Sequence, residues 1–325
     1  MHNLLPKLDL NITNRCNFRC EHCAFDSGCK EMDEMTKDEL TLLLQETKEL
    51  GGTKIDITGG EPTIRNDYAD ILKVAKDLDY KVELVTNGSL LNKETLAYLH
   101  SLGLDSIAVS LDGSTYATHA KIRRCGEEQY ECAKQTIDDA LAEMLIVKVN
   151  TVVRAENIGD IPQITAYCID RRVHEHGLYY FTPVGRGKAD LERCIDPKEW
   201  LSVIRERLVP YAERMKISVE IPMHENIIAP CLLHEDPYHL QVLPDGNIYP
   251  CAILASYNRA IGNLHARGVE EIWNDEKMWK SYRGVVDNFV FAKWNGFCFP
   301  VPESWKEYRD LHPVCPLRKF DPRNV

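Results

Sequence analysis

The feature that most constrains the fold is an alternation of short β-branched runs with segments of helical periodicity over the first 182 residues. Six runs have strand character: "LDLNIT", "KIDIT", "KVELVT", "SIAVSL", "IVKVNTVV" and "LYYF". The periodicity between them predicts helices over roughly 36–50, 66–78, 91–102, 127–144 and 157–170. Because strands that alternate with helices form right-handed βαβ units, the sequence predicts an α/β fold around a parallel sheet.

Two of the expected helices carry start signals. Thr36 is followed three residues later by Glu39, which is the spacing of a capping box. Asn92 directly precedes "KETLAYLH" and can cap the helix that this segment begins. We therefore expect helices to begin at both positions.

Residues with special chemistry follow four consecutive strands. Cysteines follow the first strand, "TGGEP" the second, "TNG" the third and "LDG" the fourth. In parallel α/β sheets the carboxyl ends of the strands meet on one side, and functional residues gather there. The four segments are therefore expected to form one site.

The cysteines of this site are Cys16, Cys20 and Cys23, in the segment "RCNFRCEHCAF". In a chain without an export signal, clustered cysteines indicate metal binding or catalysis more often than disulfides. A closed structural zinc site requires four ligands, often as paired C-x2-C units. Three cysteines without a nearby fourth partner favour a 4Fe–4S cluster with one iron left open for a ligand, and zinc is the alternative.

The C-x3-C-x2-C spacing after the first strand resembles the signature of radical S-adenosylmethionine (radical SAM) enzymes. The resemblance covers about the first 182 residues and implies a partial (β/α)6 TIM-like barrel. It implies that Cys16, Cys20 and Cys23 ligate the cluster and that the open iron binds S-adenosylmethionine. Electron transfer from the reduced cluster would then yield a 5′-deoxyadenosyl radical. His22, before the third cysteine, would lie near the adenine, although a lone histidine is more often structural.

The segment "TGGEP" resembles the next motif of the same family. Adjacent glycines at Gly59 and Gly60 let the backbone approach a ligand closely. The carboxylate of Glu61 can pair with the ammonium group of the ligand. Pro62 is typical of a helix start, and a Gly-Gly pair by itself would indicate only a turn.

The later strand ends resemble family segments that contact the ribose and methionine parts of the ligand. Their polar residues are Asn87, Ser110, Asp112 and Asn150. Arg123, in "KIRRCG", resembles a segment that reaches the carboxylate of the ligand. "TPVGRG" resembles the end of the sixth strand beside the adenine. Each of these residues also has a non-functional alternative. Asn87, Ser110 and Asp112 could be ordinary turn formers, Asn150 an outward-facing strand residue, and Arg123 a solvated surface residue.

The sequence changes character after a further helix at roughly 197–215 and a strand near 217–221. We divide the chain into a barrel, residues 1–222, and a smaller domain, residues 223–325.

In the second domain "LPDGNIYPC" predicts a hairpin with Asp-Gly at its turn. With "IGNLHARGVEEIWN" it resembles the auxiliary-cluster domain called SPASM, or its shorter twitch form. This resemblance implies one auxiliary 4Fe–4S cluster on Cys231, Cys251, Cys298 and Cys315. Cys298 has the weakest case, and a structural zinc site on the same four is the alternative.

Five cysteines fall in neither set: Cys29, Cys125, Cys132, Cys168 and Cys194. Most are expected to be small buried hydrophobic residues, and this interpretation is strongest for Cys132 and Cys168 in helical segments. One of the others could donate a hydrogen atom to a substrate radical.

Charge and hydropathy exclude several classes of partner. The formal net charge is −11 and is spread along the chain, whereas nucleic-acid binding requires clustered Lys and Arg. No apolar run approaches the ~18 residues of a membrane-spanning helix, and the N-terminus lacks the features of a secretory signal. We therefore expect a cytoplasmic protein with no nucleic-acid or membrane partner.

The function expected from these features is a radical SAM oxidoreductase with an auxiliary 4Fe–4S cluster and an electron donor such as flavodoxin or ferredoxin. It would abstract hydrogen from a C–H bond of a small-molecule or peptide substrate.

Cys16 lies too near the start for a leader-binding domain, which favours a small molecule or a peptide presented by a partner. The chain resembles molybdenum-cofactor cyclases in size but does not end in Gly-Gly, and "PVGRG" keeps tetrapyrrole modification open. The alternatives are a peptide maturase that forms cross-links or epimers, a methyl transferase and a zinc-binding scaffold.

Overall fold

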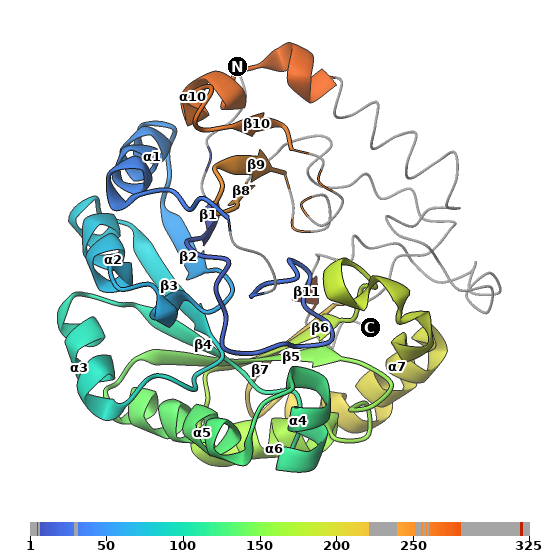
Figure 1. Ribbon diagram of the computed structural model, residues 1–325. Coiled ribbons are helices and arrows are strands. Elements are labelled where there is room, and N and C mark those ends of the chain that lie inside the picture. The colour runs from blue at the N-terminus through green and yellow to red at the C-terminus, as the bar shows by residue number, and fades with distance from the viewer. Residues whose placement is uncertain are drawn as a thin grey trace.

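The computed structural model describes residues 5, 7–28, 32–220, 239–250, 252, 255, 258, 260–280 and 319–320. A curved sheet surrounds a lumen, and most helices lie outside it (Figure 1). The strands are β1 (Lys7–Asn11), β2 (Lys54–Thr58), β3 (Lys81–Thr86), β4 (Ser106–Ser110), β5 (Ile146–Val153), β6 (Glu175–Tyr180), β7 (Lys216–Glu220), β8 (His239–Val242), β9 (Asn247–Tyr249), β10 (Gly262–Asn263) and β11 (Lys319–Phe320).

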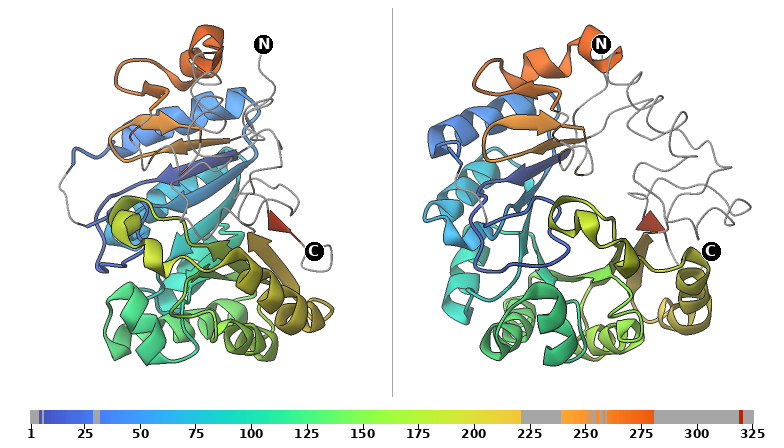
Figure 2. Two further views of the ribbon diagram at one scale, coloured as in Figure 1. Left: turned by 90° about the vertical axis from the view of Figure 1, so that its right-hand side faces the viewer. Right: turned by 45° about the vertical axis from the view of Figure 1, so that its right-hand side comes forward.

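The α-helices are α1 (Lys37–Glu49), α2 (Tyr68–Asp77), α3 (Lys93–Ser101), α4 (Tyr116–Arg123), α5 (Glu127–Ala142), α6 (Ile161–Arg171), α7 (Pro197–Val203) and α10 (Val269–Trp273). Short 3₁₀ turns are η1 (Pro62–Ile64), η2 (Gly185–Ala189), η3 (Leu191–Arg193) and η5 (Val209–Tyr211), and η4 (Ile204–Leu208) is a π-helical turn. Figure 2 shows the arrangement from two further sides. Among the described residues, no helix is long and apolar enough to cross a membrane.

The strand order is β10-β9-β8-β1-β2-β3-β4-β5-β6-β7-β11. Strands β1 to β7 pair in chain order and run parallel, which confirms the predicted parallel sheet, and β7 corresponds to the strand expected near 217–221. β8 pairs parallel with the free edge of β1. The described part of the C-terminal region therefore continues the sheet of the barrel.

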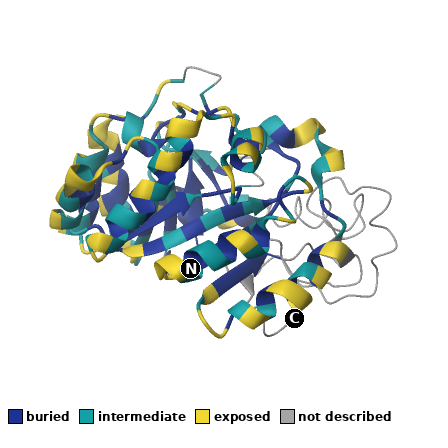
Figure 3. Cartoon of the chain, turned by 90° about the horizontal axis from the view of Figure 1, so that it is seen from below, coloured by how far each residue is buried: buried dark blue, intermediate teal, exposed yellow. Residues whose placement is uncertain are grey.

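Alternation along the strands explains how the sheet is packed. In β2, Ile55 and Ile57 are fully buried and belong to the hydrophobic core between the sheet and the helices. Lys54 and Asp56, at the intervening positions, line the lumen instead. The strands are largely dark blue in Figure 3, whereas the outer faces of the helices carry most of the exposed residues. The core thus lies outside the strands, and the lumen is left polar.

The predicted start signals are confirmed. The Thr36 hydroxyl accepts the Glu39 N–H at 3.2 Å, and the Glu39 carboxylate accepts the Thr36 N–H at 2.7 Å. The Asn92 side chain accepts the Thr95 N–H at 2.9 Å and caps α3. The predicted hairpin is also present, because β8 and β9 are antiparallel and Gly246 lies in the turn with φ of +77°. The sequence did not predict α4, which carries Arg123 at its last position.

His176 packs on the outer face of β6 and gives the fold a pH dependence. Its ring nitrogens lie 3.0 Å from the hydroxyls of Thr151 and Thr165, and burial lowers the pKa of the ring to about 3. The neutral ring is therefore favoured in the folded state, whereas the unfolded chain takes up the proton below about pH 6.5. The free energy of unfolding should consequently fall as the pH drops from about 6.5 toward 3.

The variant His176→Gln should lose about 1.4 kcal/mol less stability than the wild type between pH 7 and pH 5.5. Urea unfolding of the metal-free protein at the two pH values measures this difference. His100→Gln, at the end of α3, is the matched control. Equal losses in the wild type and His176→Gln would show that His176 does not contribute to the pH dependence.

Candidate active site at the cysteine loop

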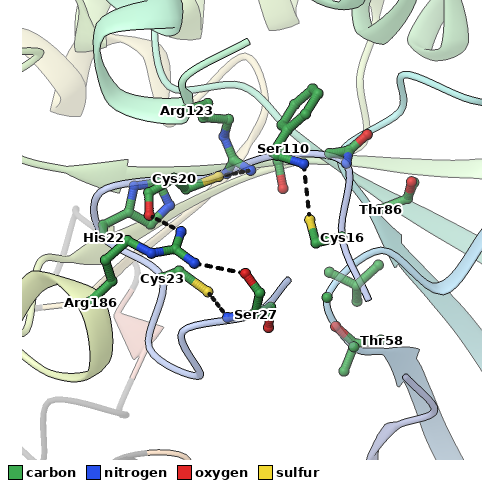
Figure 4. Close-up of a pocket in the computed structure, with 15 residues that line it drawn as sticks. Cys16, Cys20, His22, Cys23, Ser27, Thr58, Thr86, Ser110, Arg123 and Arg186 are labelled. Atoms are coloured by element: carbon green, nitrogen blue, oxygen red, sulfur yellow. Dashed lines mark hydrogen bonds between the residues drawn. The ribbon is translucent and has the colours of Figure 1, made fainter. Parts of the chain in front are cut away.

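The cysteine loop, residues 12–28, follows β1 and lies at the carboxyl ends of the barrel strands. Cys16, Cys20 and Cys23 line a cavity of about 160 Å³ (Figure 4). The cavity is also lined by residues at or after the ends of four further strands, β2, β3, β4 and β6. The remaining lining residues are Phe18, His22, Ser27, Thr58, Gly59, Gly60, Val85, Thr86, Asn87, Ser110, Arg123 and Arg186. The four segments that the sequence predicted to meet are therefore brought together.

Each of the three sulfur atoms is contacted by one donor of the chain. The Phe18 N–H lies 3.4 Å from Cys16 Sγ, and the Ser27 N–H lies 3.3 Å from Cys23 Sγ. The guanidinium of Arg123 approaches Cys20 Sγ at 4.0 Å. Donors of this kind stabilise thiolates, and hydrogen bonds to ligand sulfur tune iron–sulfur clusters.

Burial favours the protonated thiols of Cys16 and Cys20. Burial raises the pKa of Cys16 to about 11 and that of Cys20 to about 12, even though Arg123 acts in the opposite direction on Cys20. Metal binding must therefore displace protons from these thiols. Assembly of a metal centre should become less favourable as the pH falls.

The donor set at the cavity consists of three thiols. Within the part of the chain that the structure describes, no group of three or more His, Cys, Asp or Glu side chains is placed to hold one metal ion. The three sulfurs instead surround a cavity. Two buried polar atoms of its lining, His22 Nδ1 and Ser27 Oγ, have no hydrogen-bond partner among the described residues. Three thiols around a cavity with orphaned polar atoms suit a 4Fe–4S cluster and its ligand.

The two glycines of "TGGEP" are required by the chain itself. A Cβ on Gly60 would lie 2.3 Å from the Arg15 carbonyl oxygen, and one on Gly59 would lie 2.6 Å from that of Thr13. The Gly60 N–H donates to the Thr13 carbonyl at 2.7 Å. The close approach that the sequence predicted is thus made to the cysteine loop, and both glycines also line the cavity.

Glu61 lies behind the cavity lining. Its side chain is fully buried and accepts hydrogen bonds from Thr63 and from the Thr86 hydroxyl and the Asn87 N–H, the last two at 2.7 Å. Burial raises the pKa of this carboxyl, although the donors oppose the shift. Glu61 therefore joins the ends of β2 and β3, and Pro62 begins the turn η1 as expected.

Asp112 and Arg123 form a buried ion pair beside Cys20. The Arg123 Nε donates to Asp112 Oδ2 at 2.6 Å, and the Val152 N–H donates to Asp112 Oδ1 at 2.7 Å. Burial would raise the pKa of Asp112, but the charge of Arg123 holds it below its ordinary value. Arg123 is buried, so the alternative of a solvated arginine is wrong.

His22 joins this group from the cysteine loop. Its Nε2 lies 3.7 Å from Asp112 Oδ2, and burial lowers the pKa of the ring to about 3, against the opposing effect of Asp112. The neutral imidazole therefore presents one nitrogen to Asp112, while Nδ1 is the orphaned atom described above.

The other predicted site residues divide into three groups. Asn87 and Ser110 line the cavity, as the sequence predicted for strand ends. Asn150 lies on the same face of β5 as Lys148 and Val152, which line the lumen, so the alternative of an outward-facing residue is wrong. Cys231, Cys251, Cys298 and Cys315 lie outside the described residues, so the predicted auxiliary ligands remain a prediction.

Six lining residues were not predicted: Phe18, Ser27, Thr58, Val85, Thr86 and Arg186. Thr58 and Thr86 lie within the predicted segments "TGGEP" and "TNG", and Val85 directly precedes Thr86, so their positions at strand ends are the signal in the sequence. Arg186 lies within "TPVGRG", a segment that predicts the end of the sixth strand but contains no signal for a role of the arginine itself.

A second, larger cavity of about 730 Å³ occupies the lumen. Its charged lining residues are Lys7 and Asp9 (β1), Lys54 and Asp56 (β2), Glu83 (β3), Lys148 (β5), Glu175 (β6), and Lys216 and Glu220 (β7). Ion pairs join Lys7 to Asp56 at 2.8 Å, Lys216 to Glu175 at 2.8 Å, and Lys148 to Glu83. Val152, Phe181 and Val184 form an apolar part near the carboxyl ends of the strands, beside His22. Because His22 lines both cavities, the two adjoin.

The spare cysteines lie apart from both cavities where the structure describes them. Cys168 is fully buried in the core, as expected, whereas Cys125, Cys132 and Cys194 are partly exposed. Full burial of Cys132 was therefore a wrong expectation. Cys29 lies outside the described residues.

Comparison with known families gives two matches. A model of the radical SAM superfamily matches residues 10–168, and a model of an iron–sulfur cluster-binding domain, SPASM, matches residues 231–299. The chain is 31% identical over 220 residues to a probable GTP 3′,8-cyclase of Saccharolobus islandicus, covering 67% of this chain and 68% of that protein.

Two further relatives are 25% identical. One is an AdoMet-dependent heme synthase of Methanosarcina barkeri, and the match covers 84% of this chain and 83% of that protein. The other is a PqqA peptide cyclase of Bradyrhizobium diazoefficiens, and the match covers 85% of this chain and 74% of that protein. Among solved structures, Streptococcus suis SuiB bound to S-adenosylmethionine has a TM-score of 0.76 at 15% identity, covering 94% of this chain and 77% of that one. This likeness confirms the partial TIM-barrel fold.

Proposed function

Because this chain belongs to the radical SAM superfamily, we propose that Cys16, Cys20 and Cys23 hold a 4Fe–4S cluster that cleaves S-adenosylmethionine. When bound and reduced by one electron from an external donor, this group would supply a 5′-deoxyadenosyl radical, with methionine as the other product, and so the means to remove a hydrogen atom from a substrate C–H bond and form 5′-deoxyadenosine. The protein contributes binding, orientation and the exclusion of water.

The observation that carries this proposal is the arrangement of the three sulfurs. They surround a cavity at the carboxyl ends of the strands, and each is contacted by one donor of the chain. A site prepared in this way stabilises thiolate ligands while leaving space for a further ligand. The neutral His22 ring and the backbone at Gly59 and Gly60 line this cavity, which supports their proposed role as contacts to S-adenosylmethionine.

Asn87, Ser110 and Arg123 complete the proposed binding site, since all three line the same cavity. Glu61 and Asp112 act from behind it, where Glu61 receives the Asn87 N–H and Asp112 holds Arg123. Asn150, on the lumen face of β5, is proposed as a further contact to S-adenosylmethionine. Pro62 sets the path of the chain after Glu61.

The lumen is the proposed place for the substrate. Its apolar part, with Val152, Phe181 and Val184, lies beside His22 and suits the C–H bond that reacts. Its ionic part lies toward the beginning of the strands and suits a polar or charged group. This lining favours a small polar molecule over a tetrapyrrole, whose ring system would need a larger apolar surface.

A peptide substrate is the second candidate. The relative that is a PqqA peptide cyclase supports it, because the match covers 85% of this chain. A polar side chain of a peptide could enter the same lumen.

The C-terminal domain is proposed to hold one auxiliary 4Fe–4S cluster. The SPASM match supports Cys231, Cys251 and Cys298 within its bounds, and Cys315 follows it. The two family matches fall on either side of the proposed domain boundary at residue 222. We further propose a cytoplasmic location and a flavodoxin or ferredoxin as the electron donor.

Anaerobic reconstitution tests the proposal. We expect about eight iron and eight sulfide per chain, because two 4Fe–4S clusters are proposed. Dithionite and S-adenosylmethionine should then give 5′-deoxyadenosine, measured by mass spectrometry. About four iron per chain would contradict the proposed auxiliary cluster. Bound zinc without the visible absorption of an iron–sulfur cluster would favour the alternative of a zinc-binding scaffold. S-adenosylhomocysteine in place of 5′-deoxyadenosine would indicate methyl transfer.

A further inference from the structure

The side chain of Arg186, in the segment after β6, contacts the cysteine loop at three points. Its Nη1 donates to the Cys20 carbonyl and its Nη2 to the Ser27 carbonyl, both at 2.7 Å. Its Nε pairs with Asp26 at 2.9 Å. These contacts bring the guanidinium across the loop, from the limb that holds Cys20 to the limb beyond Cys23 (Figure 4).

The backbone around Arg186 is fitted to the same loop. The Arg186 N–H donates to the Cys23 carbonyl at 2.9 Å. Gly185 has φ of +56°, and a Cβ there would lie 2.2 Å from the Ala24 carbonyl oxygen. Only glycine combines this conformation with so close an approach. The segment after β6 therefore packs directly on the loop, and Arg186 lines the cavity of the three sulfurs.

Other main-chain hydrogen bonds also anchor the loop, among them those from Gly60 to Thr13 and from Glu61 to Arg15. The Gly28 N–H donates to the Asn14 carbonyl at 2.7 Å, and the Glu21 N–H donates to the Ile122 carbonyl at 2.9 Å. None of these bonds connects the Cys20 limb to the Ser27 limb. A guanidinium has five donors in a fixed plane and can bridge two carbonyls at once, whereas a lysine ammonium is a point charge on a flexible stem.

Arg186 differs in kind from Arg123. Arg123 directs its guanidinium toward the sulfur of Cys20 and contributes to the pKa of that thiol. The hydrogen bonds described for Arg186 end on main-chain oxygens and on Asp26, so it acts on the shape of the loop. We propose that Arg186 is a positioning residue, which holds the cysteine loop in the shape that lets S-adenosylmethionine reach the open iron. This inference rests on the proposed function.

The test uses the anaerobically reconstituted full chain as wild type, Arg186→Lys and a control, Arg171→Lys. Arg171 pairs with Asp138 on the surface of α6, away from the site. The readout is the change in the electron paramagnetic resonance signal of the reduced cluster during titration with S-adenosylmethionine. Because Arg186→Lys loses at least one charge-assisted hydrogen bond, we expect its half-saturating concentration to rise about tenfold. The control should match the wild type.

A second variant separates positioning from folding. Asp26→Asn keeps Arg186 and removes only the carboxylate charge at Nε, and asparagine tolerates the φ of +49° at this position. We expect a shift of about twofold in the same direction, with iron content equal to the wild type. If Arg186→Lys titrates like the wild type, the inference is wrong. It is equally wrong if Arg186→Lys takes up no cluster while Asp26→Asn titrates like the wild type. A wild type without any response would instead overturn the proposed function.

Discussion

Replacing Cys20 with serine is expected to abolish the formation of 5′-deoxyadenosine. The three cysteines are proposed to act as one unit around a single cluster, so the loss of one ligand should cost as much as the loss of all three. Residues that act as a unit commonly give losses on the order of 10⁴-fold or more. Cys20 is chosen because its sulfur is the one that Arg123 approaches. The serine hydroxyl is a harder ligand than a thiolate and should bind iron of the cluster poorly. Mass spectrometry of the anaerobic reaction with dithionite measures the effect.

The same variant separates the two proposed clusters. Iron should fall from about eight to about four per chain, because the auxiliary cluster would keep its own ligands. Cys132→Ser is the matched control, since Cys132 lies on α5 and lines neither cavity. Retention of 5′-deoxyadenosine formation by Cys20→Ser would refute the assignment of the ligand set.

The parts of the fold that local sequence determines could be predicted closely. The expected strands "KIDIT", "KVELVT" and "IVKVNTVV" coincide with β2, β3 and β5, because β-branched runs between turn residues leave little choice of boundary. The caps at Thr36 and Asn92 were equally readable, since the partner of each cap lies three residues away. α4 was missed because its sequence, "YATHAKIR", has little helical periodicity.

Roles that depend on distant partners could not be predicted. Nothing local shows that Glu61 would accept its bonds from Thr86 and Asn87 on the next strand. The contacts of Arg186 with Cys20 and Ser27 join residues about 160 positions apart, so spacing gives no signal for them.

The polar lumen, by contrast, did leave a trace in the sequence. Strands that are buried on both faces are usually apolar throughout, and the interior of a closed TIM barrel is filled by bulky side chains. Here "KIDIT" alternates charged with apolar residues, and Lys54 and Asp56 line the lumen. This alternation indicates a barrel with an open, ionic interior, in which a polar substrate can bind.

The ion pair of Arg123 with Asp112 should dominate the stability of the site before any cluster is bound. Asp112 is fully buried, so Arg123→Met would leave its charge without a counter-ion. Breaking one side of a buried pair typically costs about 3–5 kcal/mol. Arg123→Met should therefore lower the free energy of unfolding of the metal-free protein by about that amount, as measured by urea unfolding.

The double variant Arg123→Met, Asp112→Asn should recover much of this loss, because it removes the buried charge together with its partner. The cycle formed with Asp112→Asn isolates the coupling between the two side chains, which we expect to exceed about 1 kcal/mol. A sum of single losses equal to the double loss would mean that the pair is not coupled. In the reconstituted protein the double variant should still lower the midpoint potential of the cluster, because the positive charge that approaches Cys20 would be gone. Stability and potential therefore respond to different parts of the same pair, and only the wild-type arginine maintains both.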